Sequence, residues 1–189
     1  MDVSRFSLIL IFQVIEYMLK PSRIFLVGPM GAGKTTIGRQ LAQALGLEFD
    51  DTDQEIQRRT GVDIPTIFEY EGEEGFRQRE MKVIADMVEE DNIVLATGGG
   101  AVTMPENRRL LAARGYVIYL SCSPEQQFER TYKDKNRPLL QTEDPMQRLQ
   151  ELNAERDPMY REISDLVVST EGRSAQAVVK EVVHHFENA

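Results

Sequence analysis

The most informative stretch of this 189-residue chain reads Gly-Pro-Met-Gly-Ala-Gly-Lys-Thr and spans residues 28–35. It follows the apolar run 24–27, which predicts a buried strand, and it runs into residues 34–45, whose apolar side chains recur on one helical face. Strand, glycine-rich turn, Gly-Lys-Thr and helix in this order are typical of a phosphate-binding loop. The alternative is a glycine turn that binds nothing, and the complete pattern argues against it.

The residue types in this loop suit the phosphates of a nucleotide. Glycines let backbone N–H groups approach phosphate oxygens closely, and the N-terminus of the following helix adds a partial positive charge. Lys34 is predicted to reach the outer phosphates, and the Thr35 hydroxyl to help hold Mg²⁺. The predicted nucleotide-binding residues of the loop are Gly31, Ala32, Gly33, Lys34, Thr35 and Thr36.

The composition is that of an ordinary globular domain, and it narrows the class of partner. A net charge of −9 argues against DNA or RNA as the main partner. The single cysteine, Cys122, excludes an internal disulfide and a cysteine-based zinc site, and it indicates the reducing cytoplasm. The only histidines, His184 and His185, stand close to the C-terminus, so we expect a carboxylate or the substrate itself to handle any proton transfer.

The first 20 residues form an extension of unknown role. Their apolar run 8–12 is too short to span a bilayer, and the absence of a small-residue cleavage site argues against a signal peptide. Three interpretations stay open: an amphipathic helix packed on the domain, a weak membrane-surface contact, or an upstream translation start with Met18 opening a shorter chain. We expect residues 21–189 to form a single domain with no membrane partner.

Predicted strands and helices alternate along the rest of the chain, which is typical of a three-layer α/β fold, a parallel sheet with helices on both faces. Several predicted strands are continuous apolar runs, as expected where both faces of a sheet are covered. The predicted strands are 23–27, 48–50, 93–97, 117–120 and 166–168. The predicted helices are 34–45, 52–60, 64–70, 72–89, 105–113, 124–132, 145–156 and 175–186, and the helix 72–89 carries Glu80 on its apolar side.

Residues 132–144 are polar and basic and are then broken by Pro138, which indicates a mobile lid rather than a core element. A solvated loop is the alternative. A lid that carries Arg137 over the phosphate loop would supply the positive charge that phosphoryl transfer needs.

Two carboxylates, Asp51 and Asp53, follow the second predicted strand. Because ligands bind at the C-terminal ends of the strands in such sheets, both are expected near the phosphate loop. One could bind Mg²⁺, usually through water, while the other orients a hydroxyl and accepts its proton. The alternative is that one of them only caps the helix that begins at residues 52–53.

Three consecutive glycines, residues 98–100, follow the third predicted strand. They cost backbone entropy, which makes sense where a substrate touches the main chain, and a plain flexible turn is the alternative. Arg77, Arg137 and Arg156 are candidates for binding a carboxylate or a phosphate, because arginine pairs bidentately with both. Each could instead be a solvated surface charge, and Arg156 is expected at a helix end.

In combination, these motifs resemble those of shikimate kinases over residues 23–186. The phosphate loop alone occurs in many families, whereas the ordered set is specific. That set consists of the loop 28–35, Asp51-Thr-Asp53, Gly72-Glu-Glu-Gly-Phe-Arg77, Gly98-Gly-Gly100, Arg137-Pro-Leu-Leu140 and Arg156-Asp-Pro-Met-Tyr160.

The resemblance implies transfer of the γ-phosphoryl group of ATP to the 3-hydroxyl of shikimate, a step toward chorismate and the aromatic amino acids. It implies a five-stranded parallel sheet, a P-loop kinase fold like that of nucleoside monophosphate kinases. We expect a cytoplasmic monomer that uses ATP and Mg²⁺.

The resemblance also assigns roles to residues. Asp53 would hold the shikimate hydroxyls and act as the base, with Lys34 and Arg137 neutralising the transferring phosphoryl group. Arg130 would stack on adenine, and Arg173 would border the base. Thr35 and Asp51 would serve Mg²⁺. The implied substrate residues are Asp53, Arg77, Gly98, Gly99, Gly100 and Arg156, the two arginines binding the carboxylate.

Other functions compete with this one. Gluconate kinases and nucleoside kinases share the phosphate loop, but the predicted acceptor residues suit a small hydroxylated acid, and no aromatic stacking platform for a nucleobase is evident. A regulatory GTPase would need an Asn/Thr-Lys-x-Asp motif, which does not occur. A nucleotide-binding scaffold without catalysis would bind ATP and release no ADP with any sugar acid.

Overall fold

A computed structural model describes residues 21–132 and 138–188, and within these residues five strands form one parallel sheet in the order β2-β3-β1-β4-β5. The strands are β1 (Arg23–Val27), β2 (Glu48–Asp51), β3 (Ile93–Ala96), β4 (Tyr116–Ser121) and β5 (Leu166–Ser169). The helices are α2 (Lys34–Leu45), α3 (Thr52–Thr60), α4 (Ile64–Met87), α5 (Pro105–Arg114), α6 (Pro124–Thr131), α7 (Pro145–Ile163) and α8 (Ala175–Glu187), with 3-10 turns η1 (Ala101–Thr103) and η2 (Pro138–Leu140).

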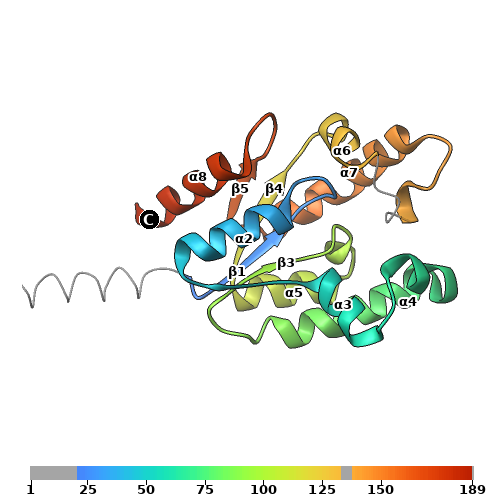
Figure 1. The fold of residues 1–189 in the computed structure, drawn as a ribbon, viewed down its shortest axis with the longest axis horizontal. Helices are drawn as coiled ribbons and strands as arrows, with labels where there is room; N and C mark the ends of the chain where they lie inside the picture. Colours follow the sequence, from blue (N-terminus) through green and yellow to red (C-terminus); the bar gives the residue numbers. More distant parts are fainter. Residues whose placement is uncertain (1–20, 133–137, 189) are drawn as a thin grey trace, which may run out of the picture.

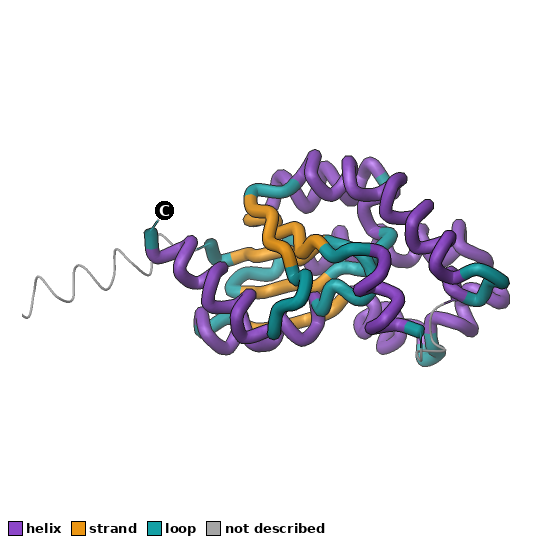
Figure 2. The backbone as a smooth tube through the Cα atoms, turned by 90° about the horizontal axis from the view of Figure 1, so that it is seen from above, coloured by secondary structure: helices purple, strands orange, loops and turns teal. Residues whose placement is uncertain are grey.

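Helices cover both faces of the sheet, as the sequence predicts. Successive residues of a strand point to opposite faces, so Ile24 and Leu26 of β1 pack with α2 and α8, whereas Phe25 and Val27 pack with α3, α4, α5 and α7. Figure 1 shows α2 and α8 on one side of the strands and α3, α4 and α5 on the other. Figure 2 shows the strands enclosed between these helices. The three-layer α/β prediction is confirmed.

The burial of the central strands explains why the sequence predicts them correctly. Residues 24–27 of β1 and all of β3 are buried, because neighbouring strands and two helical layers surround them. Such strands must be apolar on both faces, which produces the continuous hydrophobic runs in the sequence. The parallel register, with Ile24 opposite Val94 and Leu26 opposite Ala96, brings the C-terminal ends of β1 and β3 to the same edge.

Helix α7 corrects one prediction: it runs to Ile163 instead of ending at Arg156. Proline inside a helix removes a hydrogen bond and disfavours continuation, so the Asp-Pro dipeptide after Arg156 favours a helix end at this point. The helix continues through Pro158 because Tyr160 and Ile163, on its next turn, are buried in the core against the sheet. Tertiary packing therefore outweighs the local cost of the proline.

The predicted helices 64–70 and 72–89 meet directly in α4, without a loop between them. Gly72 interrupts the helix with φ 68° and ψ −176°, a conformation that glycine adopts far more easily than other residues. The two predicted helices are thus confirmed as two halves joined at a sharp break.

Three predictions fall on residues that the structure does not describe. The extension 1–20 lies outside the described ranges, and so do residues 133–137, which include Arg137 and the centre of the predicted lid. No helix among the described residues is both long enough and apolar enough to cross a membrane.

Candidate functional site

The phosphate loop has the backbone conformation that anion binding requires. Gly31 and Gly33 have φ angles of 78° and 88°, in the left-handed region that favours glycine. Gly33 is also the N-cap of α2, and as a glycine it offers no side-chain cap to the first turn of that helix. The N-terminal N–H groups of α2 are therefore not satisfied by a side-chain cap, and such groups bind anions.

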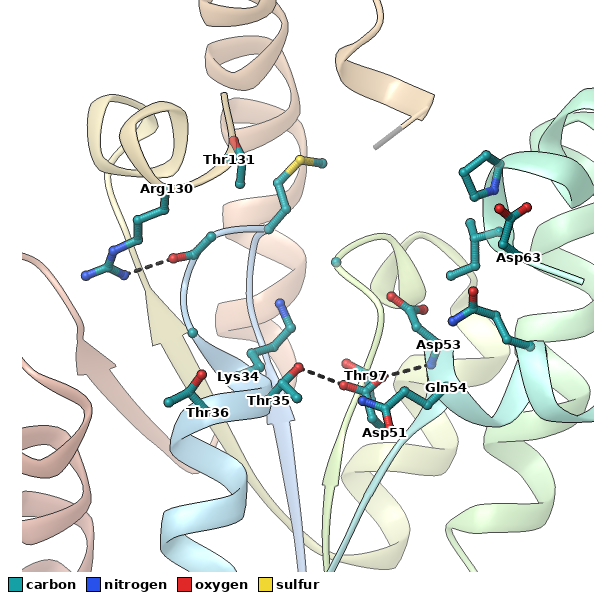
Figure 3. Close-up of a pocket in the computed structure, with 17 residues that line it drawn as sticks. Lys34, Thr35, Thr36, Asp51, Asp53, Gln54, Asp63, Thr97, Arg130 and Thr131 are labelled. Carbon is teal, nitrogen blue, oxygen red and sulfur yellow. Dashed lines mark hydrogen bonds between the residues drawn. The ribbon is translucent and has the colours of Figure 1, made fainter. Parts of the chain in front are cut away.

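A pocket of about 590 Å³ lies over this loop; we call it the phosphate-loop pocket. Figure 3 shows Lys34, Thr35, Asp51 and Asp53 together in this pocket. The predicted site residues that line it are Gly31, Gly33, Lys34, Thr35, Thr36, Asp51, Asp53, Gly99 and Arg130. Its other lining residues are Met30, Gln54, Gln57, Asp63, Ile64, Pro65, Thr97 and Thr131.

The Lys34 side chain forms hydrogen bonds with its own phosphate loop. Its ammonium group donates hydrogen bonds to the carbonyl oxygens of Gly28 and Pro29, at 2.6 and 2.7 Å. The side chain is thereby held at the base of the pocket, with its charge beside the loop that it was predicted to serve.

Asp51, at the end of the second strand, accepts a hydrogen bond from the phosphate loop and caps the helix that follows. Its Oδ2 atom accepts a hydrogen bond of 2.8 Å from the Thr35 hydroxyl, and its Oδ1 atom accepts one of 3.0 Å from the backbone N–H of Asp53. The second bond is the N-cap of α3. A hydroxyl and a carboxylate side by side are the oxygen donors that Mg²⁺ prefers.

A second pocket, of about 70 Å³, adjoins the first; we call it the arginine pocket. The two pockets share Met30, Asp53, Ile64 and Gly99, so Asp53 stands at their junction. The arginine pocket contains the predicted substrate residues Asp53, Arg77, Gly98, Gly99, Gly100 and Arg156. Glu80, Phe68, Phe76, Pro138 and Leu139 complete its lining with Met30 and Ile64.

Arg77 is buried and ion-paired rather than solvated. Its Nη1 atom lies 2.7 Å from Oε2 of Glu80, and its Nη2 atom 3.0 Å from Oε1 of Glu73. Burial by itself disfavours the charged guanidinium, but the two carboxylates outweigh burial and raise the pKa of Arg77. The arginine is therefore held as a cation in a fixed orientation.

Glu80 is a charged residue of the arginine pocket that the sequence analysis does not assign to the site. Its side chain has no exposed surface, and its Oε1 atom has no hydrogen-bond partner among the described residues. Burial and, to a smaller extent, the nearby Asp53 raise the pKa of Glu80 to about 7, although Arg77 opposes this. The available signal was its position: a glutamate on the apolar side of a helix, three residues after an arginine.

Arg156 comes from a different part of the chain and is also buried. It lies inside α7 and not at a helix end, and its Nη2 atom is 3.9 Å from the same Glu73 oxygen that pairs with Arg77. Burial lowers the pKa of Arg156, and the neighbouring cation of Arg77 adds to this effect. The two arginines thus face the same carboxylate oxygen, at 3.0 Å from Arg77 and 3.9 Å from Arg156.

The glycine triplet is explained by close approach rather than by flexibility. A Cβ atom at Gly98 would lie closer than 3.0 Å to carboxylate oxygens of both Glu80 and Asp53. A Cβ atom at Gly100 would lie closer than 3.0 Å to the guanidinium of Arg77. Charged side chains occupy the space that any other residue would need, so the plain-turn interpretation does not account for these positions.

Three residues that were predicted to bind the nucleotide lie in different places relative to the pockets. Arg130 lines the phosphate-loop pocket and donates a hydrogen bond of 2.9 Å to the carbonyl of Gly31 (Figure 3). Arg173 is not among the lining residues of either pocket; its guanidinium bonds to the carbonyl of Ser169 and pairs with Glu181 on α8. Ala32 is fully buried in the core and is not among the lining residues of either pocket.

Comparison with known proteins agrees with this geometry. The family model described as "Shikimate kinase" matches residues 30–187. A shikimate kinase from Methylococcus capsulatus is 62% identical over 166 residues, which cover 88% of this chain and 93% of that protein. A solved structure, "Shikimate kinase from Acinetobacter baumannii in complex with shikimate", has a TM-score of 0.87 and 50% identity, and covers 88% of this chain and 93% of that one.

A more distant structure concerns the rival function. A gluconokinase from Sinorhizobium meliloti has a TM-score of 0.55 and 17% identity, over 89% of this chain and 93% of that one. At this identity the likeness extends to the fold alone.

Proposed function

The chain belongs to the shikimate kinase family, and from this premise we propose that it transfers the γ-phosphoryl group of ATP to the 3-hydroxyl group of shikimate. The products would be shikimate 3-phosphate and ADP, in the route to chorismate and the aromatic amino acids. The observation that carries the proposal is the position of Asp53, which lines both the phosphate-loop pocket and the arginine pocket.

In the phosphate-loop pocket, backbone N–H groups at the start of α2 would bind the phosphates of ATP. Lys34 would leave the loop carbonyls and neutralise the charge on the transferring group. Arg130, at the rim, would contact the adenine. Arg137 keeps the charge-neutralising role that the family resemblance implies.

Thr35 and Asp51 fit a magnesium ion, since they present a hydroxyl and a carboxylate 2.8 Å apart. Among the described residues no group of three or more His, Cys, Asp or Glu side chains could hold a metal by itself. That suits Mg²⁺, which is usually bound by one or two protein oxygens together with substrate phosphates and water. When bound, the ion would reduce the negative charge that develops on the phosphates.

In the arginine pocket, Arg77 and Arg156 would bind the carboxylate of shikimate in place of Glu73. This orientation would direct the hydroxyls of the ring toward Asp53. The Asp53 carboxylate would then accept the proton as the 3-hydroxyl oxygen bonds to the γ-phosphorus and the bond to ADP breaks. Glu80 would keep the Arg77 guanidinium in its orientation through the 2.7 Å ion pair.

One experiment compares the candidate functions directly: ADP release measured with shikimate, gluconate and nucleoside monophosphates side by side. We expect release with shikimate to exceed the others by at least a hundredfold. A preference for gluconate would favour the rival kinase function. ADP release that is equally slow with every acceptor would favour a nucleotide-binding scaffold.

We also propose that the enzyme acts as a cytoplasmic monomer. Cys122 is a free, buried thiol, which is compatible with a reducing compartment. Light scattering at assay concentration measures the oligomeric state.

A further inference from the structure

Tyr160 is a buried residue at the edge of the site that has no role in the scheme above. It lies on α7, one helical turn after Arg156, and only 1% of its surface is exposed. Its hydroxyl donates a hydrogen bond of 2.5 Å to the carbonyl oxygen of Gly99. Burial raises the pKa of this phenol, so it stays protonated and remains a donor.

The position of the Gly99 peptide affects both pockets. It lines both pockets, and its Cα faces the phosphate loop: an added Cβ atom would lie 3.2 Å from the backbone nitrogen of Met30 and 3.6 Å from the carbonyl oxygen of Gly28. An added Cβ atom at the flanking residues Gly98 and Gly100 would lie closer than 3.0 Å to the Asp53 carboxylate and the Arg77 guanidinium, respectively. A shift of the Gly99 peptide would therefore move the acceptor side of the site relative to the phosphate loop.

The Tyr160 ring is itself well fixed. It stacks on Tyr119 of β4 with ring centroids 4.9 Å apart, and both rings belong to the core between the sheet and α7. The Tyr119 hydroxyl bonds to Asp157 at 2.8 Å, and Asp157 lines neither pocket. The Tyr160 hydroxyl is thus a donor at a fixed place in the core, aimed at a backbone carbonyl of the site.

We propose that Tyr160 is a positioning residue: through its hydrogen bond to the Gly99 carbonyl it aligns the arginine pocket with the phosphate loop, and so aligns the acceptor hydroxyl with the phosphoryl group. The inference rests on the proposed function, because it assigns the two pockets to acceptor and donor. Phosphoryl transfer depends almost entirely on positioning and charge, and a displacement of 1 Å can cost a hundredfold in rate.

The test compares two variants that each remove one hydroxyl from the same stacked pair. Tyr160→Phe deletes the bond to Gly99, and the matched control Tyr119→Phe deletes the bond to Asp157, which keeps its ion pair with Arg161. We expect Tyr160→Phe to lower kcat/KM for shikimate about tenfold or more, while the dissociation constant for ATP changes less than twofold. Tyr119→Phe should leave both constants within twofold of the wild type, whatever its effect on the melting temperature.

The proposal is overturned if the two variants lose activity equally, in proportion to their loss of stability, or if Tyr160→Phe matches the wild type. A wild type that releases no ADP with shikimate refutes the proposed function instead. In that case hydrogen exchange of residues 97–101 still tests the contact: exchange should accelerate in Tyr160→Phe and not in Tyr119→Phe. Equal exchange in the two variants would show that the hydroxyl does not hold the segment.

Discussion

The two pockets differ in how the chain builds them. One continuous stretch, residues 28–36, forms the phosphate-binding part of the phosphate-loop pocket, and most of the groups it offers to a phosphate are backbone N–H groups. The arginine pocket is assembled from α3, α4, the glycine triplet, η2 and α7, and it relies on buried charged side chains. The first kind of site is encoded locally, whereas the second exists only after the fold has brought distant segments together.

The largest effect is expected at Asp53, where the pockets meet. Asp53→Asn keeps the shape of the side chain but removes the proton acceptor, so kcat should fall on the order of 10³-fold. The measurement is coupled ADP release, with ATP affinity by calorimetry as the control. A kcat within tenfold of the wild type would exclude Asp53 as the base.

The second-largest effect is expected on substrate binding in the arginine pocket. Arg77→Met should raise the KM for shikimate about 10²-fold, because a bidentate carboxylate partner is lost, while ATP affinity stays within twofold. Arg79→Met is the matched control: Arg79 is on the same helix, is exposed, and pairs only with Glu71 among the described residues. If the KM for shikimate is untouched in Arg77→Met, the assignment of the arginine pocket fails.

A smaller change tests close approach in the same pocket. Gly100→Ala places a methyl group against the Arg77 guanidinium, and we expect the KM for shikimate to rise about tenfold. Backbone strain is not the cause, since the φ of −98° at Gly100 is accessible to alanine. Steady-state kinetics with either substrate varied would locate the effect. An unchanged KM would mean that Arg77 can move without cost.

The pH dependence of stability reports on Glu80. Its pKa is raised from 4.5 to about 7 in the folded protein, so between these values the folded state binds more protons than the unfolded state. Its contribution to stability is therefore fully present below pH 4.5 and is lost as the pH rises toward 7, on the order of 1 kcal/mol per pH unit. Urea unfolding from pH 4.5 to 7.5 should show this slope in the wild type and not in Glu80→Gln. Parallel curves for the two proteins would contradict it.

The smallest effects are expected at the nucleotide rim. Arg130→Ala should raise the KM for ATP a few-fold, since Arg130 lines the pocket and contacts Gly31. Arg173→Ala should leave the KM for ATP within twofold, because Arg173 joins β5 to α8 outside the pocket. A larger change in the KM for ATP in Arg173→Ala than in Arg130→Ala would support a position of Arg173 beside the adenine.

The sequence predicted the fold well because its signals are local. Buried central strands read as apolar runs, and the phosphate loop lies between β1 and α2 as its pattern requires. The one substantial error, the end of α7, arose where core packing of Tyr160 and Ile163 overrides a proline. No local rule reports such packing, because it depends on residues far away in the chain.

The sequence predicts some residues of the candidate site and not others. Asp53, Arg77 and Arg156 were identified as members of one site only through the family resemblance, since spacing alone does not bring α3, α4 and α7 together. Glu80 and Tyr160 were not identified, because a buried glutamate or tyrosine acts here through another residue of the site. Arg173 lines neither pocket and pairs with Glu181, so its place beside the adenine stays a prediction.

The pairing of Arg77 with two glutamates affects how an acidic substrate arrives. A cation whose carboxylate partners lie at 2.7 and 3.0 Å projects little field beyond its own pocket, and the chain as a whole carries a net charge of −9. Long-range attraction therefore contributes little to the encounter, and recognition takes place on contact. Added salt should therefore not slow substrate capture by this enzyme, unlike capture by sites that steer anions from a distance.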